Sequence, residues 1–188
     1  MSYKHHEIEV RFLEIDKDQL IQKLTKLGAT DLGEEFLKET IFYDKDLNWK
    51  NGGKKIVRVR SNSKNSKVTY KHHFEDSATG TIEYEFTVED PEIAHLFLEA
   101  VGLVAFRNQE KKRHTFQLDD VTFDIDTWPK IPTYVELEGP TEESLKEMAK
   151  KLDLNWDEVT FENPRTVIEK YYNIPVGHMK YFTFDRFE

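Results

Sequence analysis

The sequence predicts an α+β fold, in which a closed or nearly closed eight-stranded antiparallel β-barrel forms a tunnel and helices pack outside it. Three observations support this prediction. Short segments in which apolar and polar residues alternate dominate the chain, as expected for half-buried strands. Segments with apolar residues at helical spacing interrupt these strands. The helical segments also carry recognisable start and stop residues.

The first half of the chain contributes one helix and five of the expected strands. Residues 5–14 alternate cleanly and predict the first strand. Asp16 is a typical helix N-cap, and Gly28 ends the leucine-rich helical stripe that follows it. Further strands are expected near 35–44, 54–61, 67–74 and 81–89, with a turn at Asn51-Gly52-Gly53 before the second of these.

The second half begins with another helix. Pro91 is expected in its first turn, and Gly102 ends it. Strands follow at about 104–118, 121–126 and 133–138, and Asp119-Asp120 predicts a tight hairpin between the first two. Thr141 predicts the start of a third helix, and a short fourth helix is expected after Pro164.

Length and composition indicate a single folded domain of 188 residues. We expect this domain to span residues 1–173, with an aromatic tail at 174–188 that forms an added edge strand or an oligomer contact. The chain has no cysteine, no apolar run long enough for a membrane span and no signal-peptide pattern, so we expect a cytoplasmic protein.

The charge balance limits the partners that the chain is expected to bind. Lys and Arg number 27 against 36 Asp and Glu, which gives a formal net charge of −9. An acidic surface disfavours nonspecific binding to nucleic acid and to anionic membranes, so we expect neither partner. A local basic cluster is still compatible with this total.

Charged residues recur at alternate positions on nearly every expected strand, and alternate positions share one face. The opposite face is apolar in most of these strands. The charged positions are Glu7, Glu9, Arg11, Arg58, Arg60, Lys67, Lys71, Glu83, Glu85, Lys111, Arg113, Asp126, Glu136 and Glu138. If the apolar faces pack against the helices, these side chains line the interior of the barrel.

The simplest interpretation of such a face is a solvated sheet surface with ordinary cross-strand ion pairs. Like-charged doublets within one strand, however, repel each other unless something neutralises them. Carboxylates are the ligands that Mg²⁺ and Mn²⁺ prefer, and guanidinium and ammonium groups suit phosphate oxygens. A divalent metal ion together with a polyphosphate would satisfy both sets. The adjacent pairs His5-His6 and His72-His73 are poorer metal candidates, because neighbouring strand residues point to opposite faces.

The ordered set of motifs resembles the CYTH superfamily, the triphosphate tunnel metalloenzymes, over about residues 5–172. Any one motif is weak, but seven in order are a specific signal. The motifs are Glu7-Ile8-Glu9-Val10-Arg11, Val57-Arg58-Val59-Arg60, Thr69-Tyr70-Lys71, Glu83-Tyr84-Glu85, Glu110-Lys111-Lys112-Arg113, Asp126 and Glu136-Leu137-Glu138.

The resemblance implies roles for these residues. Phosphate groups would be bound by Arg11, Arg58, Arg60, Lys71, Lys111 and Arg113. Arg11, Lys71 and Lys111 would be the catalytic residues. Mg²⁺ or Mn²⁺ would be held among Glu7, Glu9, Glu83, Glu85, Asp126, Glu136 and Glu138.

The resemblance is closest in pattern to class IV adenylyl cyclases, which implies conversion of ATP to cyclic AMP and pyrophosphate. Two alternatives stay open: a triphosphatase acting on inorganic, thiamine or nucleoside triphosphate, and a non-catalytic polyphosphate-binding module. A homodimer is also implied. Two positions depart from the family pattern, because Arg11 replaces the usual lysine and Phe42 stands where a tyrosine is expected.

Overall fold

The computed structural model describes residues 8–52, 55–73 and 81–188, the side chains of residues 73 and 81 excepted. Within these residues the chain divides into two compact units. Unit 1 contains Phe36–Lys111 and His178–Glu188, and unit 2 contains residues 8–35 and Lys112–Gly177. Two long strands, β2 (Thr30–Asp44) and β6 (Leu103–Leu118), have residues in both units.

The strands form one hydrogen-bonded path in the order β1-β8-β7-β6-β2-β3-β4-β5. The remaining strands on this path are β1 (Ile8–Phe12), β3 (Lys55–Ser61), β4 (Ser66–His73), β5 (Thr81–Val88), β7 (Val121–Thr127) and β8 (Tyr134–Gly139). Every ladder that the register defines along this path is antiparallel. The predicted α+β class with eight antiparallel strands and helices outside them is therefore confirmed. The path ends at β1 and at β5.

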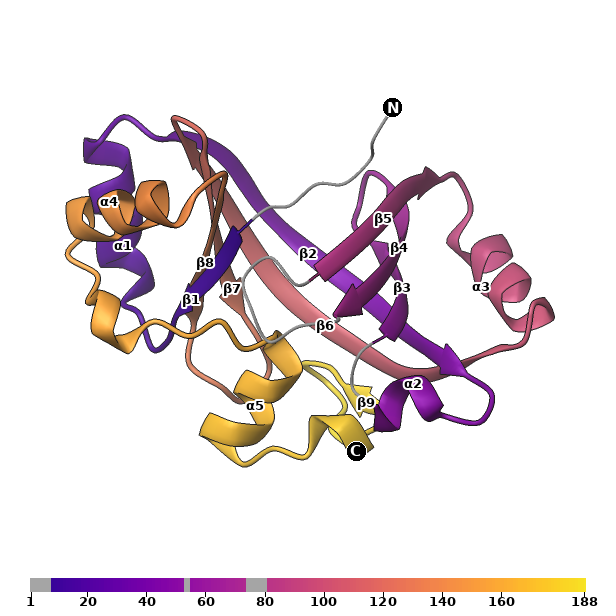
Figure 1. Cartoon of the computed structure of the whole chain (residues 1–188). Coiled ribbons are helices and arrows are strands. Elements are labelled where there is room, and N and C mark those ends of the chain that lie inside the picture. The colour runs from indigo at the N-terminus through magenta and orange to yellow at the C-terminus, as the bar shows by residue number, and fades with distance from the viewer. Residues whose placement is uncertain (1–7, 53–54, 74–80) are drawn as a thin grey trace. The chain divides into compact units, whose positions relative to one another are not determined.

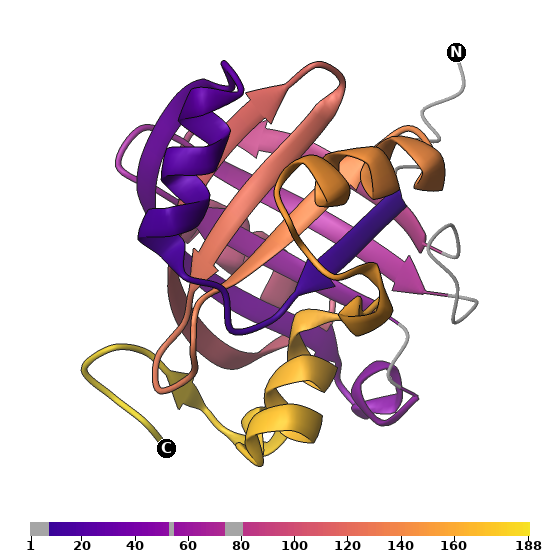
Figure 2. The same ribbon diagram turned by 90° about the vertical axis from the view of Figure 1, so that its left-hand side faces the viewer.

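Unit 2 has a core between two helices and one face of its strands. The helices are α1 (Lys17–Lys26) and α4 (Glu142–Lys151), and both lie against the strands in Figure 2. Leu20 and Leu24 of α1 and Leu145 of α4 pack with Phe123 and Leu137 of the sheet in one buried cluster. Apolar side chains at alternate strand positions therefore bury against the helices, and their neighbours point to the opposite face.

The predicted helix caps of unit 2 are confirmed. The Asp16 side chain accepts a hydrogen bond from the Gln19 backbone, and Thr141 accepts one from Ser144. Gly28 has φ +81°, a left-handed conformation that ends the chain's first helix without a Cβ penalty. The expected fourth helix is α5 (Pro164–Tyr172), which begins after Asn163. A single 3-10 turn, η1 (Trp156–Glu158), lies between α4 and α5.

Unit 1 repeats the same arrangement with a different helix. The helix α3 (Pro91–Ala100) lies beside β3, β4 and β5 in Figure 1. Its Ala94 and Leu98 pack with Phe42, Val57 and Val59 in a second buried cluster, which also includes Val68. A short helix, α2 (Asn48–Asn51), precedes β3 and was not expected from the sequence, because the Asn51-Gly52 turn signal masked it. Gly53 lies outside the described residues.

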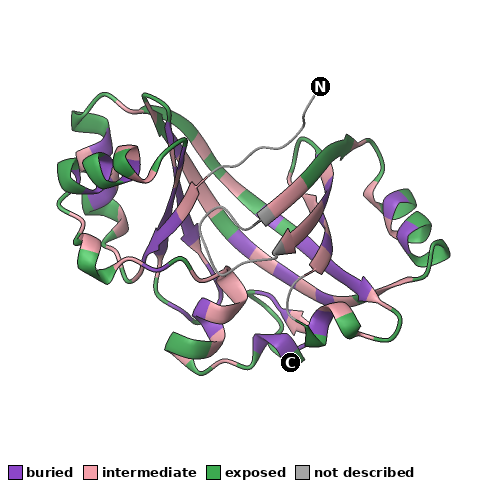
Figure 3. Cartoon of the chain, viewed as in Figure 1, coloured by how far each residue is buried: buried purple, intermediate pink, exposed green. Residues whose placement is uncertain are grey.

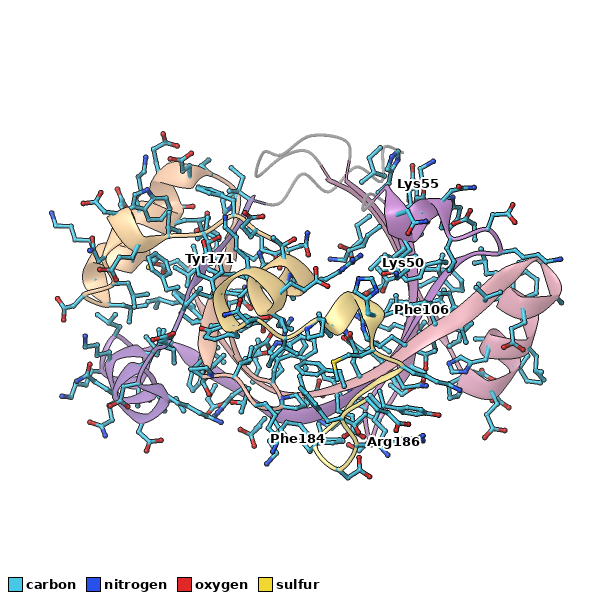
Figure 4. The ribbon with its side chains drawn as sticks, turned by 90° about the horizontal axis from the view of Figure 1, so that it is seen from below. Lys50, Lys55, Phe106, Tyr171, Phe184 and Arg186 are labelled. Atoms are coloured by element: carbon cyan, nitrogen blue, oxygen red, sulfur yellow. The ribbon has the colours of Figure 1, made fainter. Side chains whose placement is uncertain are left out.

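The C-terminal tail is divided between the units, with residues 174–177 in unit 2 and His178–Glu188 in unit 1. It contains the 3-10 turn η2 (Val176–His178) and the strand β9 (Tyr181–Phe182), which pairs in parallel with β6. The Phe184 ring lies 5.8 Å from Phe36, and the Arg186 guanidinium lies 3.5 Å from the centre of the Tyr181 ring (Figure 4). The tail therefore adds a strand to the sheet, while its role as an oligomer contact stays a prediction.

Among the described residues, no helix combines the length and apolar character needed to cross a membrane.

Candidate functional site

The predicted site residues fall into two clusters, one in each unit. We define the cationic cluster of unit 1 as Glu39, Arg58, Arg60, Arg107, Gln109 and Lys111, flanked by ion pairs of Lys67, Lys71, Glu83 and Glu85. We define the acidic cluster of unit 2 as Glu9, Arg11, Arg113, Asp124, Asp126, Glu136 and Glu138. Glu7, His5 and His6 lie outside the described residues.

Strand register gathers the cationic cluster. Glu39 of β2 pairs with Arg60 of β3, and Arg60 pairs with Lys67 of β4, so the three side chains share a face. Arg58 lies two residues from Arg60 on that face. The opposite face carries Phe42, Val57 and Val59 and packs against α3. The prediction that apolar faces turn to the helices and charged faces turn away is thus confirmed for this unit.

Glu39 is the central anion of the cationic cluster and is almost fully buried, with 3% exposure. One carboxylate oxygen lies 2.6 Å from Nε of Arg60 and 3.6 Å from a terminal nitrogen of Arg58. The other accepts a hydrogen bond from Nε2 of Gln109 at 2.6 Å. Gln109 in turn accepts one from Nε of Arg107 at 2.8 Å. Strands β2, β3 and β6 are therefore tied together through one carboxylate.

The charges around Glu39 decide its protonation state. Burial by itself would raise the pKa of Glu39, but Arg60, Arg58 and Lys111 outweigh this effect and hold the pKa well below its ordinary value. Three cationic side chains thus act on one carboxylate. Arg58 also lowers the pKa of Glu85, so this guanidinium acts on two carboxylates.

The charged doublets of β4 and β5 neutralise each other. Lys71 lies 2.6 Å from Glu83, its partner in register, and Lys67 lies 2.6 Å from Glu85. Thr69 is fully buried and donates a hydrogen bond of 2.9 Å to Glu85. The Lys67 and Thr69 contacts hold the pKa of Glu85 below its ordinary value despite partial burial, which acts the other way. Repulsion within these doublets is therefore relieved inside the protein.

Arg113 organises the acidic cluster. Its Nε and one terminal nitrogen each lie 2.6 Å from Asp126, whose side chain is fully buried. Arg113 also contacts Asp124, and its distance to Glu136 is 3.3 Å. Burial would lower the pKa of Arg113, but Asp126, Asp124 and Glu136 together raise it well above its ordinary value. The guanidinium is permanently charged and holds three carboxylates on strands β7 and β8.

Arg11 is the second guanidinium of the acidic cluster. It is buried, forms an ion pair with Glu9, and lies 2.8 Å from Glu136. It also donates a hydrogen bond of 2.7 Å to the Glu162 backbone carbonyl, and its own backbone is bridged to Thr160. Its Nε atom is buried without a hydrogen-bond partner. Arg11 therefore stands between two of the carboxylates that the sequence assigns to metal.

The remaining acidic residues show how strongly burial acts in this unit. Burial, together with Glu136 and Asp126, raises the pKa of Asp124 in spite of Arg113. Burial and the same two carboxylates raise the pKa of Tyr134 well above its ordinary value. The Tyr134 hydroxyl accepts a hydrogen bond of 2.8 Å from Trp128. Tyr134 is therefore expected to stay protonated and is a poor general base.

The donor chemistry of the acidic cluster fits a hard divalent cation, because it consists of carboxylate oxygens. Glu9 and Glu138 are direct partners in the β1–β8 register, and Glu136 lies two residues from Glu138. Within the described ranges, however, no three His, Asp or Glu side chains converge to hold one ion. Arg11 and Arg113 form ion pairs with four of these carboxylates, those of Glu9, Asp124, Asp126 and Glu136.

Sequence reasoning missed several buried polar residues, most of which belong to the cationic cluster. Glu39 lies on the same face of β2 as the apolar residues Leu37 and Ile41, and all three are buried. A single carboxylate between apolar residues at alternate positions was the signal in the sequence that could have identified it. Arg107 and Gln109 extend the alternate positions that lead to Lys111. Lys50 was missed with α2, and it is buried with its ammonium 4.9 Å from the centre of the Phe106 ring (Figure 4).

The structure shows where Phe42 lies, the residue that stands where the family pattern has a tyrosine. Phe42 lies in the core against α3, with its ring 5.2 Å from His95. Tyr43 occupies the opposite face of β2, which it shares with Glu39, and it is buried beside Phe106. A tyrosine hydroxyl therefore stands one position after Phe42, on the charged side of the strand.

The fold and its charges define the class of protein. Each part of the antiparallel sheet has an apolar face that packs against helices and a charged face that contains buried arginines. Comparison with known proteins assigns the family. The chain matches the CYTH domain over residues 5–172 and belongs to this family. CYTH enzymes act on triphosphates and depend on metal ions.

Individual relatives support this assignment. A candidate adenylate cyclase of Methanocaldococcus jannaschii is 24% identical over 163 residues, which cover 81% of this chain and 93% of the relative. The structure of a candidate adenylate cyclase from Vibrio parahaemolyticus has a TM-score of 0.77 at 13% identity and covers 88% of this chain and 99% of its own. A Hippeastrum candidate adenylyl cyclase, described as having a dominant triphosphatase activity, has a TM-score of 0.64 at 14% identity over 88% and 95% of the two chains.

Proposed function

We propose that the chain is a metal-dependent enzyme that binds a triphosphate, with ATP as the favoured substrate and cyclic AMP and pyrophosphate as the products. The observation that supports this most is the cationic cluster, in which Arg58, Arg60 and Lys111 act on the single buried carboxylate of Glu39. The phosphate oxygens of a polyphosphate would be further acceptors for these cations. The guanidinium groups can each donate two parallel hydrogen bonds to phosphate oxygens.

The residues of unit 1 would bind and orient the phosphate chain. Glu39 contacts Arg58 and Arg60, so the orientations of their guanidinium groups are restricted before substrate binds. Such preorganisation lowers the entropy cost of binding and of reaching the transition state. Lys71, which is paired with Glu83, would turn to a phosphate oxygen when one is present. Arg11 and Arg113 would serve phosphate groups in the same manner from unit 2.

Glu9, Glu136 and Glu138 would hold Mg²⁺ or Mn²⁺, once Arg11 has left Glu9 and Glu136. The ion would neutralise charge that develops on the phosphate oxygens. Glu83 and Glu85 are less suited to this role, because lysines already neutralise them. The location of the protein in the cytoplasm stays a prediction.

In the cyclase reaction the ribose 3′-hydroxyl oxygen forms a bond with the α-phosphorus, and the bond from that phosphorus to the bridging oxygen of pyrophosphate breaks. In a triphosphatase, water attacks the terminal phosphorus instead. The second reaction is favoured by one observation, the triphosphatase activity described for the Hippeastrum neighbour. Both reactions use the same phosphate-binding residues.

A substrate panel separates these reactions. The full chain is incubated with Mn²⁺ or Mg²⁺ and with ATP, inorganic triphosphate or thiamine triphosphate, and both cyclic AMP and released phosphate are measured. Cyclic AMP from ATP supports the cyclase, and phosphate without cyclic AMP supports the triphosphatase and overturns the cyclase. Tight triphosphate binding by calorimetry without any turnover would instead show a polyphosphate-binding module. An Arg60→Gln variant serves as the control that activity arises from the cationic cluster.

A further inference from the structure

Three polar side chains form a row across the charged face of unit 1. Arg58 of β3 is the direct partner of Thr69 in the β3–β4 register, and Thr69 is the direct partner of Glu85 in the β4–β5 register. We define the β3–β5 row as Arg58, Thr69 and Glu85. In Figure 3, β5 is mostly exposed, whereas β3 and β4 carry buried and intermediate positions. The row therefore runs inward from β5, which ends the strand path.

Hydrogen bonds join the three members of the β3–β5 row. The Thr69 hydroxyl donates a hydrogen bond of 2.9 Å to one carboxylate oxygen of Glu85. The same hydroxyl accepts a hydrogen bond of 3.5 Å from a terminal nitrogen of Arg58. The other carboxylate oxygen of Glu85 accepts a hydrogen bond of 2.6 Å from the ammonium of Lys67. The Thr69 hydroxyl therefore connects an anchored carboxylate to the Arg58 guanidinium.

The chemistry of a hydroxyl gives this connection a direction. A hydroxyl has one hydrogen to donate, and an ionised carboxylate can only accept. Glu85 is ionised at neutral pH, since its pKa lies below the ordinary value. Because the Thr69 hydrogen points to Glu85, the lone pairs of the Thr69 oxygen are left for Arg58. Thr69 is fully buried, so bulk water does not compete for its hydroxyl, and the Glu85 carboxylate determines how that hydroxyl is turned.

Arg58 is held from two neighbouring strands. One terminal nitrogen contacts Thr69 of β4, and the other lies 3.6 Å from Glu39 of β2. A guanidinium is planar, so contacts at both terminal nitrogens define the orientation of the whole group. The two contacts differ in charge, because the hydroxyl of Thr69 is neutral. A neutral acceptor orients the guanidinium without cancelling the positive charge that attracts a phosphate oxygen.

We propose that Thr69 is a positioning residue for phosphate binding, and that Glu85 acts through Thr69 on Arg58 and is not a metal ligand. This rests on the proposed function, because it takes Arg58 as a phosphate-binding residue. An oriented guanidinium loses less freedom when it binds phosphate, which favours binding. The proposal gives a role to the first residue of the Thr69-Tyr70-Lys71 motif, in which the family resemblance implied a role for Lys71 alone.

Isothermal titration calorimetry with inorganic triphosphate tests the role of Thr69. The full chain is titrated in the presence of EDTA, so that metal-dependent turnover does not interfere. Thr69→Val should weaken triphosphate binding about tenfold, because the guanidinium loses one of its two fixed contacts. Thr69→Ser keeps the hydroxyl and should bind triphosphate within about twofold of wild type.

Thr40→Val is the matched control for the calorimetry. Thr40 is also buried in unit 1, and its hydroxyl donates a hydrogen bond of 2.9 Å to Asn108. Thr40 follows Glu39 directly in β2, so it lies on the opposite face of the sheet. It should lose stability as Thr69→Val does and keep the triphosphate affinity of wild type. Wild-type affinity in Thr69→Val, or an equal loss of affinity in Thr40→Val, would overturn the proposal.

Titration with Mn²⁺, followed by electron paramagnetic resonance, tests the role of Glu85. The Glu85 side chain is 29% exposed and lies beside Lys67. Glu85→Gln should keep the Mn²⁺ affinity within about twofold of wild type, because the lost charge acts on a distant ion through screened attraction alone. Loss of a metal ligand weakens binding by about tenfold or more. A loss of that size in Glu85→Gln would show that Glu85 is a metal ligand.

Nuclear magnetic resonance relaxation measures the positioning of Arg58 without any ligand. The Nε atom of Arg58 is buried, which slows exchange of its hydrogen with water. The Nε–Hε signal is assigned by its absence from an Arg58→Lys variant, and its order parameter reports motion on the picosecond to nanosecond timescale. The order parameter should fall in Thr69→Val and stay at the wild-type value in Thr69→Ser and Thr40→Val.

The relaxation measurement also separates this proposal from the proposed function. A wild-type protein that binds no triphosphate would refute the proposed function, and the Arg58 order parameter would still decide whether Thr69 positions the guanidinium. An unchanged order parameter in Thr69→Val, or an equal fall in Thr69→Ser, would overturn the proposal even if wild type binds triphosphate tightly.

Discussion

The Nε atom of Arg60 lies 2.6 Å from one carboxylate oxygen of Glu39, on the neighbouring strand, and the Glu39 side chain is almost completely shielded from water. The same carboxylate contacts Arg58 and accepts a hydrogen bond from Gln109. Glu39 is therefore a positioning residue for the cations that we expect to bind phosphate, and most of the predictions below depend on this relationship.

Glu39→Gln should lower the free energy of unfolding by roughly 3 kcal/mol, because it leaves buried cations without their counter-ion. Addition of triphosphate should restore part of this loss, since the ligand replaces the missing negative charge. The rise in melting temperature caused by triphosphate should thus be larger in the variant than in wild type. Differential scanning calorimetry measures both effects. Glu147→Gln, an exposed carboxylate on α4, is the control, and an equal rise in all three proteins would refute the prediction.

Acid should destabilise wild type through Glu39. The pKa of Glu39 in the folded protein lies well below 4.5, its ordinary value. Its contribution to stability is therefore complete above pH 4.5 and is lost as the pH falls from there through the folded pKa. Glu39→Gln should show a flatter decline over that range in urea unfolding curves. Parallel declines for the two proteins would show that other carboxylates dominate.

Arg58→Gln and Arg60→Gln should each raise the KM for the triphosphate by about tenfold to a hundredfold, because each removes charge-assisted hydrogen bonds worth roughly 1.5–3 kcal/mol. Lys64→Gln, at an exposed turn between β3 and β4, removes the same charge outside the cluster and should leave KM unchanged. Steady-state kinetics with the best substrate of the panel measures the KM of each variant. A comparable increase of KM in the Lys64 variant would show that the arginines act only through long-range electrostatic attraction.

Arg11→Met should strengthen divalent-metal binding, because Arg11 forms ion pairs with Glu9 and Glu136. Without its guanidinium these carboxylates repel each other and gain more from a metal ion. Titration with Mn²⁺, followed by electron paramagnetic resonance, gives the affinity without any need for turnover. If affinity is unchanged or falls, the metal does not use these carboxylates.

Much of this protein could be predicted from its sequence, because local patterns report local physical requirements. The period-two alternation around Arg58 and Arg60 determined which face is apolar, and Asp16, Pro91 and Thr141 determined where helices begin. The ordered charge doublets indicated the family that the CYTH match then confirmed. Each of these signals lies within a few residues of the feature it predicts.

Only the tertiary structure decided which charges meet. Glu39 gave no strong signal, because its importance comes from Arg60, Arg58 and Gln109 on two other strands. Similarly, the Glu83–Lys71 pair and the Arg11–Glu136 pair depend on strand order and register, which sequence alternation leaves open. Alternation sets the face on which a side chain lies, whereas electrostatic energy depends on the distance between side chains that are far apart in the sequence.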